Sequence, residues 1–106
     1  MRDACPQCTN AKLFPEGARA WDWTESGTSH EPGTQPGDVE ELLERGATTV
    51  VLSKGFHGRL GVTPQTLRLL EVRGVAAHVR QTEEAIRLYN ELRETERVGA
   101  LIHPTC

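Results

Sequence analysis

The C-terminus of the chain carries the two residue types best suited to nucleophilic chemistry. The sequence ends in IHPTC, which places His103 three residues before Cys106. A cysteine becomes a nucleophile when a neighbouring imidazole stabilises its thiolate. The negative charge of the terminal carboxylate opposes a thiolate beside it, and no oxyanion-hole element adjoins the pair in sequence. We therefore favour a structural interpretation, in which His103 ends a strand and forms hydrogen bonds within the domain.

A zinc site built from both ends of the chain is a second possibility. Cys5 and Cys8 form a C-x-x-C pair, and His103 and Cys106 complete four ligands of suitable softness for tetrahedral zinc. In structural zinc sites the two ligand pairs usually lie close to each other in sequence, whereas here the whole domain separates them. A redox role for Cys5 and Cys8 would need a strand before them, and no strand pattern precedes them. We expect no metal, no cofactor and no catalytic residue, with a thiol or zinc protein as an alternative.

A basic, glycine-rich loop is the third candidate. The segment KGFHGRLG, residues 54–61, carries Lys54 and Arg59 directly after a β-branched run. Ligands of open α/β sheets bind at the ends of strands, and backbone amides before a helix can hold an anion. The glycine spacing matches neither the dinucleotide-binding fingerprint nor the P-loop. An anionic-ligand site or an enzyme active site here is therefore an alternative function, and an ordinary loop is the simpler explanation.

The segment WDWTESGTSH, residues 21–30, combines aromatic and polar side chains. Trp23 and His30 could belong to a ligand platform, because indoles offer stacking area and polar groups fix orientation. The simpler interpretation is that the tryptophans cap one face of a sheet beneath a long loop. We expect Asp22 and the hydroxyls of Thr24, Ser26 and Thr28 to pin that loop.

Hydrophobic periodicity and turn signals predict the elements that position these residues. Residues 13–23 predict a turn and one short extended segment, and residues 24–37 predict a long loop. Helices and strands then alternate: we expect helices over 36–45 and 64–73 and another that begins at 82, and strands over 48–53, 75–79 and 98–103. This alternation with short connections predicts an α/β fold with a mainly parallel sheet.

Several details of these elements can be predicted as well. Thr82 is the expected N-cap of the third helix, and the apolar segment 75–79 is typical of a strand covered on both faces. The apolar face of the second helix should contain Leu67. In the third helix, either Ile86 or Ala85 should share a face with Tyr89.

Length and composition bound the remaining possibilities. A chain of 106 residues suits one domain, and we divide it into a flexible N-terminal segment, 1–11, and a single α/β domain, 12–106. The formal net charge of −3 with scattered basic residues argues against a nucleic-acid partner. The apolar runs are too short for a membrane span and the N-terminus has no secretory pattern. We therefore expect a cytoplasmic protein.

Several motifs together resemble one family. They are WDW at 21–23, GTSHEPG at 27–33, QP at 35–36, QTEEA at 81–85, YN at 89–90 and the closing HPTC at 103–106. In this order the motifs resemble the adipogenesis-associated Mth-domain-containing protein family over about residues 12–106. The resemblance implies a three-layer domain with a central mixed, mainly parallel sheet flanked by helices, plus a small additional β element.

The resemblance also implies a function. One related branch acts as an assembly factor for mitochondrial respiratory complex I, so it implies a non-enzymatic interaction, regulatory or assembly-type module with a protein partner. Relatives end similarly but lack the CPQC segment, which weakens the zinc alternative. They also carry a further β segment before WDW, so a truncated sheet here could expose an edge and favour a homodimer. The positions that the resemblance suggests for recognition are Trp23, His30, Lys54, Arg59, Gln81, Tyr89, His103 and Cys106.

Overall fold

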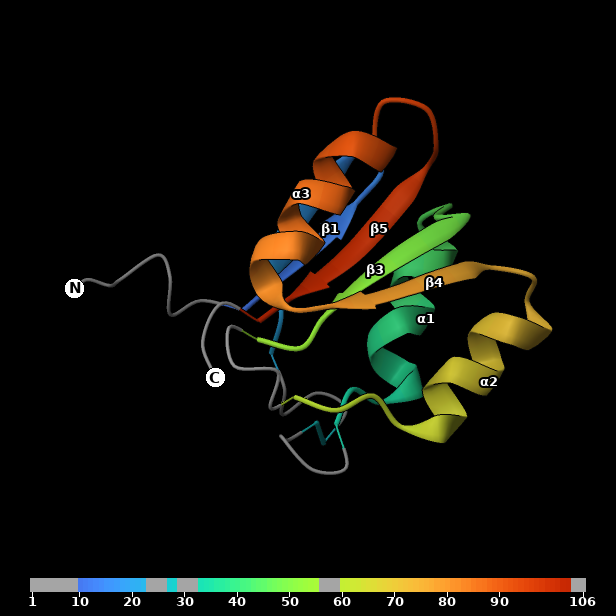
Figure 1. Ribbon diagram of the computed structural model, residues 1–106. Helices are drawn as coiled ribbons and strands as arrows, with labels where there is room; N and C mark the ends of the chain where they lie inside the picture. Colours follow the sequence, from blue (N-terminus) through green and yellow to red (C-terminus); the bar gives the residue numbers. More distant parts are fainter. Residues whose placement is uncertain (1–9, 23–26, 29–32, 56–59, 104–106) are drawn as a thin grey trace.

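A five-stranded mixed sheet forms the centre of the molecule (Figure 1). The computed structural model describes residues 10–22, 27–28, 33–55 and 60–103. Its strands are β1 (Ala11–Phe14), β2 (Gly17–Ala20), β3 (Thr49–Ser53), β4 (Ala76–Arg80) and β5 (Val98–Ile102). Its helices are α1 (Pro36–Glu44), α2 (Pro64–Val72) and α3 (Thr82–Leu92).

The strand order is β2-β1-β5-β3-β4. Strand β3 is parallel to both of its neighbours, β4 and β5, whereas β1 runs antiparallel to both of its neighbours, β2 and β5. The α/β fold and the mixed sheet predicted from the sequence are thus confirmed. No helix among the described residues is both long enough and apolar enough to cross a bilayer.

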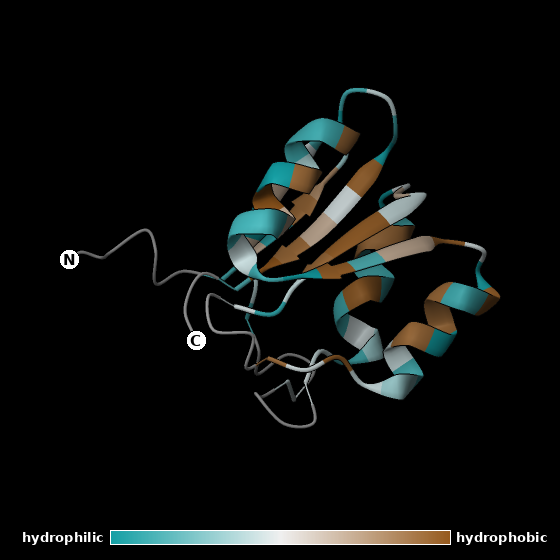
Figure 2. Ribbon diagram, in the orientation of Figure 1, coloured by the Kyte–Doolittle hydropathy of each residue, from teal (hydrophilic) through white to brown (hydrophobic). Residues whose placement is uncertain are grey.

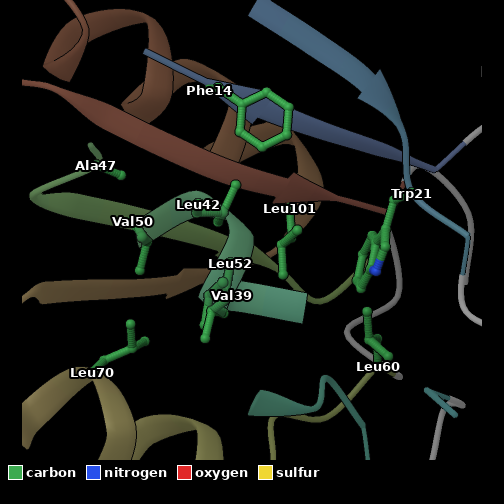
Figure 3. Close-up of a cluster of buried hydrophobic side chains, with 10 residues drawn as sticks. All are labelled: Phe14, Trp21, Val39, Leu42, Ala47, Val50, Leu52, Leu60, Leu70 and Leu101. Carbon is green, nitrogen blue, oxygen red and sulfur yellow. The ribbon is translucent and has the colours of Figure 1, made fainter. Parts of the chain in front are cut away.

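Helices cover both faces of the sheet and make three layers (Figure 1). Val50 and Leu52 of β3 pack with α1 and α2 in one cluster, drawn in Figure 3. Val51, between them in sequence, points to the other face and packs beneath α3. Figure 2 shows apolar residues concentrated along the strands of the sheet and polar residues frequent on the helices. This alternation along β3 explains why its residues are buried throughout.

The N-terminal part of the sheet is a hairpin rather than the single extended segment predicted. Strands β1 and β2 flank Pro15 and Glu16, and β1 begins at Ala11, one residue inside the segment predicted to be flexible. Lys12 hides the strand pattern of β1, because it is a charged residue that is only 3% exposed. The hairpin is the additional β element that the resemblance implied, and it is present.

Glu41 of α1 holds this hairpin against the rest of the domain. Its carboxylate accepts hydrogen bonds from Lys12 Nζ at 3.0 Å and from Arg19 Nη2 at 2.6 Å. Lys12 and Arg19 are direct partners across β1 and β2, so one carboxylate bridges both strands. The Arg19 hydrogen bonds, with the Lys12 contacts, lower the pKa of Glu41 from 4.5 to about 2.

A buried carboxylate fixes the start of α1. Asp38 is 1% exposed and accepts hydrogen bonds from Trp21 Nε1 at 2.9 Å and from the Gln35 backbone amide at 2.9 Å. The Thr28 hydroxyl also donates to Asp38. The Thr28 hydroxyl thus ties its loop to α1 through Asp38, a partner that the sequence did not indicate. Trp21 is 3% exposed and lies in the core cluster, as the simpler interpretation of the tryptophans expected.

Other details differ from the sequence-based expectations. β4 is an edge strand, because among the described strands only β3 pairs with it. Its residues are exposed or half-buried, so it is not the strand buried on both faces that the sequence predicted. Leu67 is 42% exposed and Ile86 is 43% exposed, whereas Ala85 is the buried residue that shares a cluster with Tyr89. An apolar run in sequence does not distinguish an edge strand from a central one.

We predict that Glu41→Gln weakens the fold at neutral pH and not at strongly acidic pH. A carboxylate whose pKa is depressed in the folded state stabilises it above the unfolded pKa of about 4.5, and the effect disappears as the pH falls toward 2. Urea unfolding should show a loss of about 2 kcal/mol at pH 7, discounted because Glu41 is partly exposed. Glu44→Gln is the matched control and should change little. An equal loss at pH 7 and pH 2 would contradict this role.

We predict that Asp38→Asn lowers the free energy of unfolding by about 2–4 kcal/mol. The amide keeps the shape of the carboxylate but cannot accept at both of its terminal atoms, so a buried donor loses its partner. Urea unfolding followed by tryptophan fluorescence measures the change directly, because Trp21 donates to this carboxylate. Glu40→Gln, on the exposed side of the same helix, serves as control. A loss no larger than that of the control would refute the role given to Asp38.

Candidate functional site

The carboxyl ends of the parallel strands bring together three of the candidate residues. Lys54 follows β3, Gln81 follows β4 and His103 follows β5. Tyr89 lies on α3, two turns beyond Gln81, and packs against the α3-side core. The remaining candidates lie outside the described residues: Cys5, Cys8, Trp23, His30, Arg59 and Cys106.

Two hydroxyl groups close this edge of the sheet. Ser53 Oγ accepts from the backbone amide of His103 at 3.1 Å and from that of Gly55 at 3.3 Å. Thr82 Oγ1 donates to the carbonyl of His103 at 2.7 Å and lies 2.9 Å from Ser53 Oγ. The backbone N–H of His103 is therefore held by Ser53, and its backbone C=O accepts from both Thr82 and, at 3.2 Å, Ser53. Thr82 is the first residue of α3, after the N-cap Gln81, and does not cap the helix as predicted.

The imidazole of His103 contacts Asn10. His103 Nδ1 lies 2.7 Å from Oδ1 of Asn10, the residue before β1. The side chain is only 4% exposed, so His103 is a buried residue rather than the surface position that the resemblance suggested. Ser53 contacts the backbone of His103 and not its ring, so these two residues do not form a nucleophile and base.

The environment of Lys54 opposes a strong anion site. The Lys54 amide donates to the Arg80 carbonyl at 2.9 Å, and the Lys54 carbonyl accepts from the Leu60 amide at 2.9 Å. Leu60 therefore lies beside the end of β3. The N-terminus of α3 is nearby, since the Thr82 amide donates to the Gly55 carbonyl at 3.2 Å. Two acidic residues, Glu83 and Glu84, occupy the first turn of α3 and already complement its dipole.

Metal chemistry finds no support in the described part of the chain. Within residues 10–22, 27–28, 33–55 and 60–103, no three His, Cys, Asp or Glu side chains are placed to hold a metal ion. The four ligands of the zinc alternative include three cysteines outside these ranges.

A groove lies between the β1–β2 hairpin and the C-terminal half of α3. Its volume is about 610 Å³. Leu13, Ala18 and Val98 contribute apolar surface from the sheet, while Tyr89, Arg93 and Glu96 contribute aromatic and charged groups. The guanidinium of Arg93 lies 6.0 Å from the centre of the Tyr89 ring. At this distance the pair can form a weak cation–π interaction that favours a fixed orientation.

Sequence reasoning found Tyr89 but missed Arg93, Ser53 and Thr82 as residues that shape the site. The spacing of Tyr89 and Arg93 was an available signal, because residues four apart meet on one face of a helix. The hydroxyls gave no comparable signal. Their bonds to His103 span 21 and 50 residues of sequence.

These features define a small mixed-sheet α/β domain whose strand ends are closed by internal hydrogen bonds and whose hairpin side carries an open groove. The chain belongs to the family described as "Protein of unknown function (DUF498/DUF598)", whose sequence model matches residues 8–103. That match includes the hairpin, all three helices and His103.

Solved structures support the same fold. A conserved hypothetical protein, PH1505, from Pyrococcus horikoshii OT3 is 26% identical, with a TM-score of 0.78 over 92% of this chain and 84% of that one. A protein titled MT938 is 30% identical, with a TM-score of 0.72 over 92% and 82% of the two chains. The protein XCC1710 from Xanthomonas campestris, 21% identical, shares the fold with a TM-score of 0.67 over 89% and 68%.

We predict that Ser53→Ala and Thr82→Val each destabilise the domain by about 1–3 kcal/mol, because each removes a hydroxyl that hydrogen-bonds to the buried backbone of His103. The two hydroxyls contact each other and the same residue, so the double variant should lose less than the sum of the single losses. Urea unfolding of all four proteins measures this coupling. Thr95→Val, at an exposed position, should stay within about 0.5 kcal/mol of the wild type. Strict additivity would show that the two hydroxyls are not coupled around His103.

Proposed function

We propose that the protein is a non-enzymatic cytoplasmic interaction module of a regulatory or assembly type. The observation that carries the proposal is the groove beside α3, which is lined by Tyr89 and Arg93 together with apolar side chains such as Leu13. Tyrosine and arginine dominate the binding energy of many protein interfaces, because they bury large area and still satisfy polar groups. The narrower resemblance to the adipogenesis-associated Mth-domain-containing proteins supports the same role.

The shape of the groove favours a protein segment over a small metabolite. Its floor is made by small and medium apolar side chains, including Ala18 and Val98, and charged groups of both signs stand at its wall in Arg93 and Glu96. Enclosed small-molecule sites bury most of the ligand in a concave pocket. A groove along a helix and a hairpin instead suits a chain segment that buries apolar side chains and pairs with both charges.

The closed edge of the sheet argues against catalysis by the described strand-end residues. Ser53 and Thr82 spend their hydroxyl hydrogen bonds on the backbone of His103 and on each other. A nucleophile needs a free lone pair and a base within reach, and the hydrogen bonds of Ser53 leave neither. The acids of the first turn of α3 make an anionic substrate unfavourable at that helix end.

We predict that Arg93→Glu lowers capture of the protein partner at least about tenfold, the size expected for one interface arginine. The tagged full chain is purified from its native cells, and stoichiometric partners are quantified by mass spectrometry. Arg87→Glu is the matched control, because Arg87 is an exposed arginine on the same helix that does not line the groove. Both variants should fold like the wild type.

Equal capture by the Arg93 and Arg87 variants would show that the groove is not the partner surface. No stoichiometric partner, together with turnover of a small molecule by the purified chain, would overturn the proposed function itself.

A further inference from the structure

The sheet has two edges, and they differ in how well they could pair with another strand. At one edge, β2 has four residues, and its Arg19 is held by Glu41. At the other edge, β4 has five residues and lies at the margin of the sheet (Figure 1). Its Ala76 and Ala77 are exposed. β4 contains neither proline nor lysine, and its one strongly charged residue, Arg80, stands at its end.

The backbone groups of β4 that point away from β3 can be assigned from the hydrogen bonds at its end. The Arg80 carbonyl accepts from the Lys54 amide, so Arg80 directs its backbone groups toward β3. Because backbone direction alternates along a strand, His78 also faces β3, while Ala77 and Val79 direct their amides and carbonyls away from it. The Val79 carbonyl accepts from Nη1 of Arg80 at 2.9 Å, and no other described strand pairs with this side of β4. The Val75 amide donates to the Leu70 carbonyl at 2.9 Å, so the Val75 carbonyl is the group that could accept from a partner strand.

The sequence of this edge is nearly palindromic. Residues 75–79 read Val-Ala-Ala-His-Val. If a second copy runs antiparallel about a two-fold axis at Ala77, each Val75 lies opposite Val79 and each Ala76 lies opposite His78. No like charges then face each other, and β-branched side chains pair on both sides of the axis. Ala77 and its copy exchange N–H···O=C bonds, and each Val79 amide reaches a Val75 carbonyl.

The helix beside this edge supplies apolar surface for the same contact. Ala77 and Val79 are register partners of Val50 and Leu52, so they point to the face that α2 covers. α2 ends in Val72, which is 76% exposed. Pairing through β4 brings the two α2 helices to one face of a continuous sheet, where Val72 can lose contact with water.

We propose that the protein forms a two-fold symmetric homodimer through β4. This proposal rests on the palindromic edge and not on the groove. Since β2 and β4 are opposite edges of the sheet, the groove by the hairpin lies at the far side of each copy. The dimer therefore presents two grooves at its outer ends, which would let it bind a partner bivalently.

Charge substitutions at the two-fold axis test the proposal. Ala77 is exposed in the single chain, so Ala77→Lys and Ala77→Glu should both fold. Analytical ultracentrifugation across the micromolar to millimolar range should find a dimer for the wild type and a monomer for each variant, because like charges face each other at the axis. An equimolar mixture of the two variants should restore a dimer at low salt. Ala20→Glu, at an exposed position of β2, should leave the dimer intact.

Three results would overturn this homodimer. They are a monomeric wild type over the whole range, a Lys variant that dimerises as well as the wild type, and a mixture that stays monomeric. A wild-type monomer that instead takes up an extended peptide along β4 would assign this edge to a partner strand. None of these results bears on Arg93, so they leave the proposed function standing or falling by its own experiment.

Discussion

The arrangement of the strand ends depends on the backbone N–H and C=O of His103. β5 ends at Ile102, so the amide and carbonyl of the next residue need other partners inside the protein. Ser53 supplies the acceptor from β3 and Thr82 supplies the donor from the start of α3. The three central elements are thereby joined at the edge where α/β proteins usually bind their ligands.

This constraint separates two sides of the domain that could have shared a function. At the carboxyl ends of the strands, the hydroxyls of Ser53 and Thr82 form hydrogen bonds within the domain, so these two side chains stabilise the fold. The hairpin side is shaped differently, because α3 covers the centre of one face and leaves the groove beside β1. Glu41 fixes the hairpin from the opposite face by pairing with both Lys12 and Arg19. A rigid hairpin wall and a rigid helix are what a binding groove requires.

The layered α/β architecture could be predicted from the sequence, and specific long-range contacts could not. The periods of α1 and the continuous apolar run of β3 are local patterns, so they identified their elements correctly. The hairpin was missed because a buried Lys12 is tolerated only through Glu41, 29 residues away. Thr82 was read as a helix cap because a threonine before two glutamates is typical of one, yet His103 takes its hydroxyl. The groove forms between the N-terminal hairpin and the C-terminal elements α3 and β5, and no local sequence pattern indicates that these segments meet.

The most direct measurement is native-state hydrogen exchange of the His103 amide. If its bond to Ser53 closes the edge as described, this amide should exchange only through global unfolding, as slowly as the amides of Leu52 and Leu101 in the centre of the sheet. Fast exchange at His103 with slow exchange at Leu52 and Leu101 would mean that the edge opens locally. The strand ends would then be accessible to a ligand, and the structural role given to Ser53 and Thr82 would be wrong.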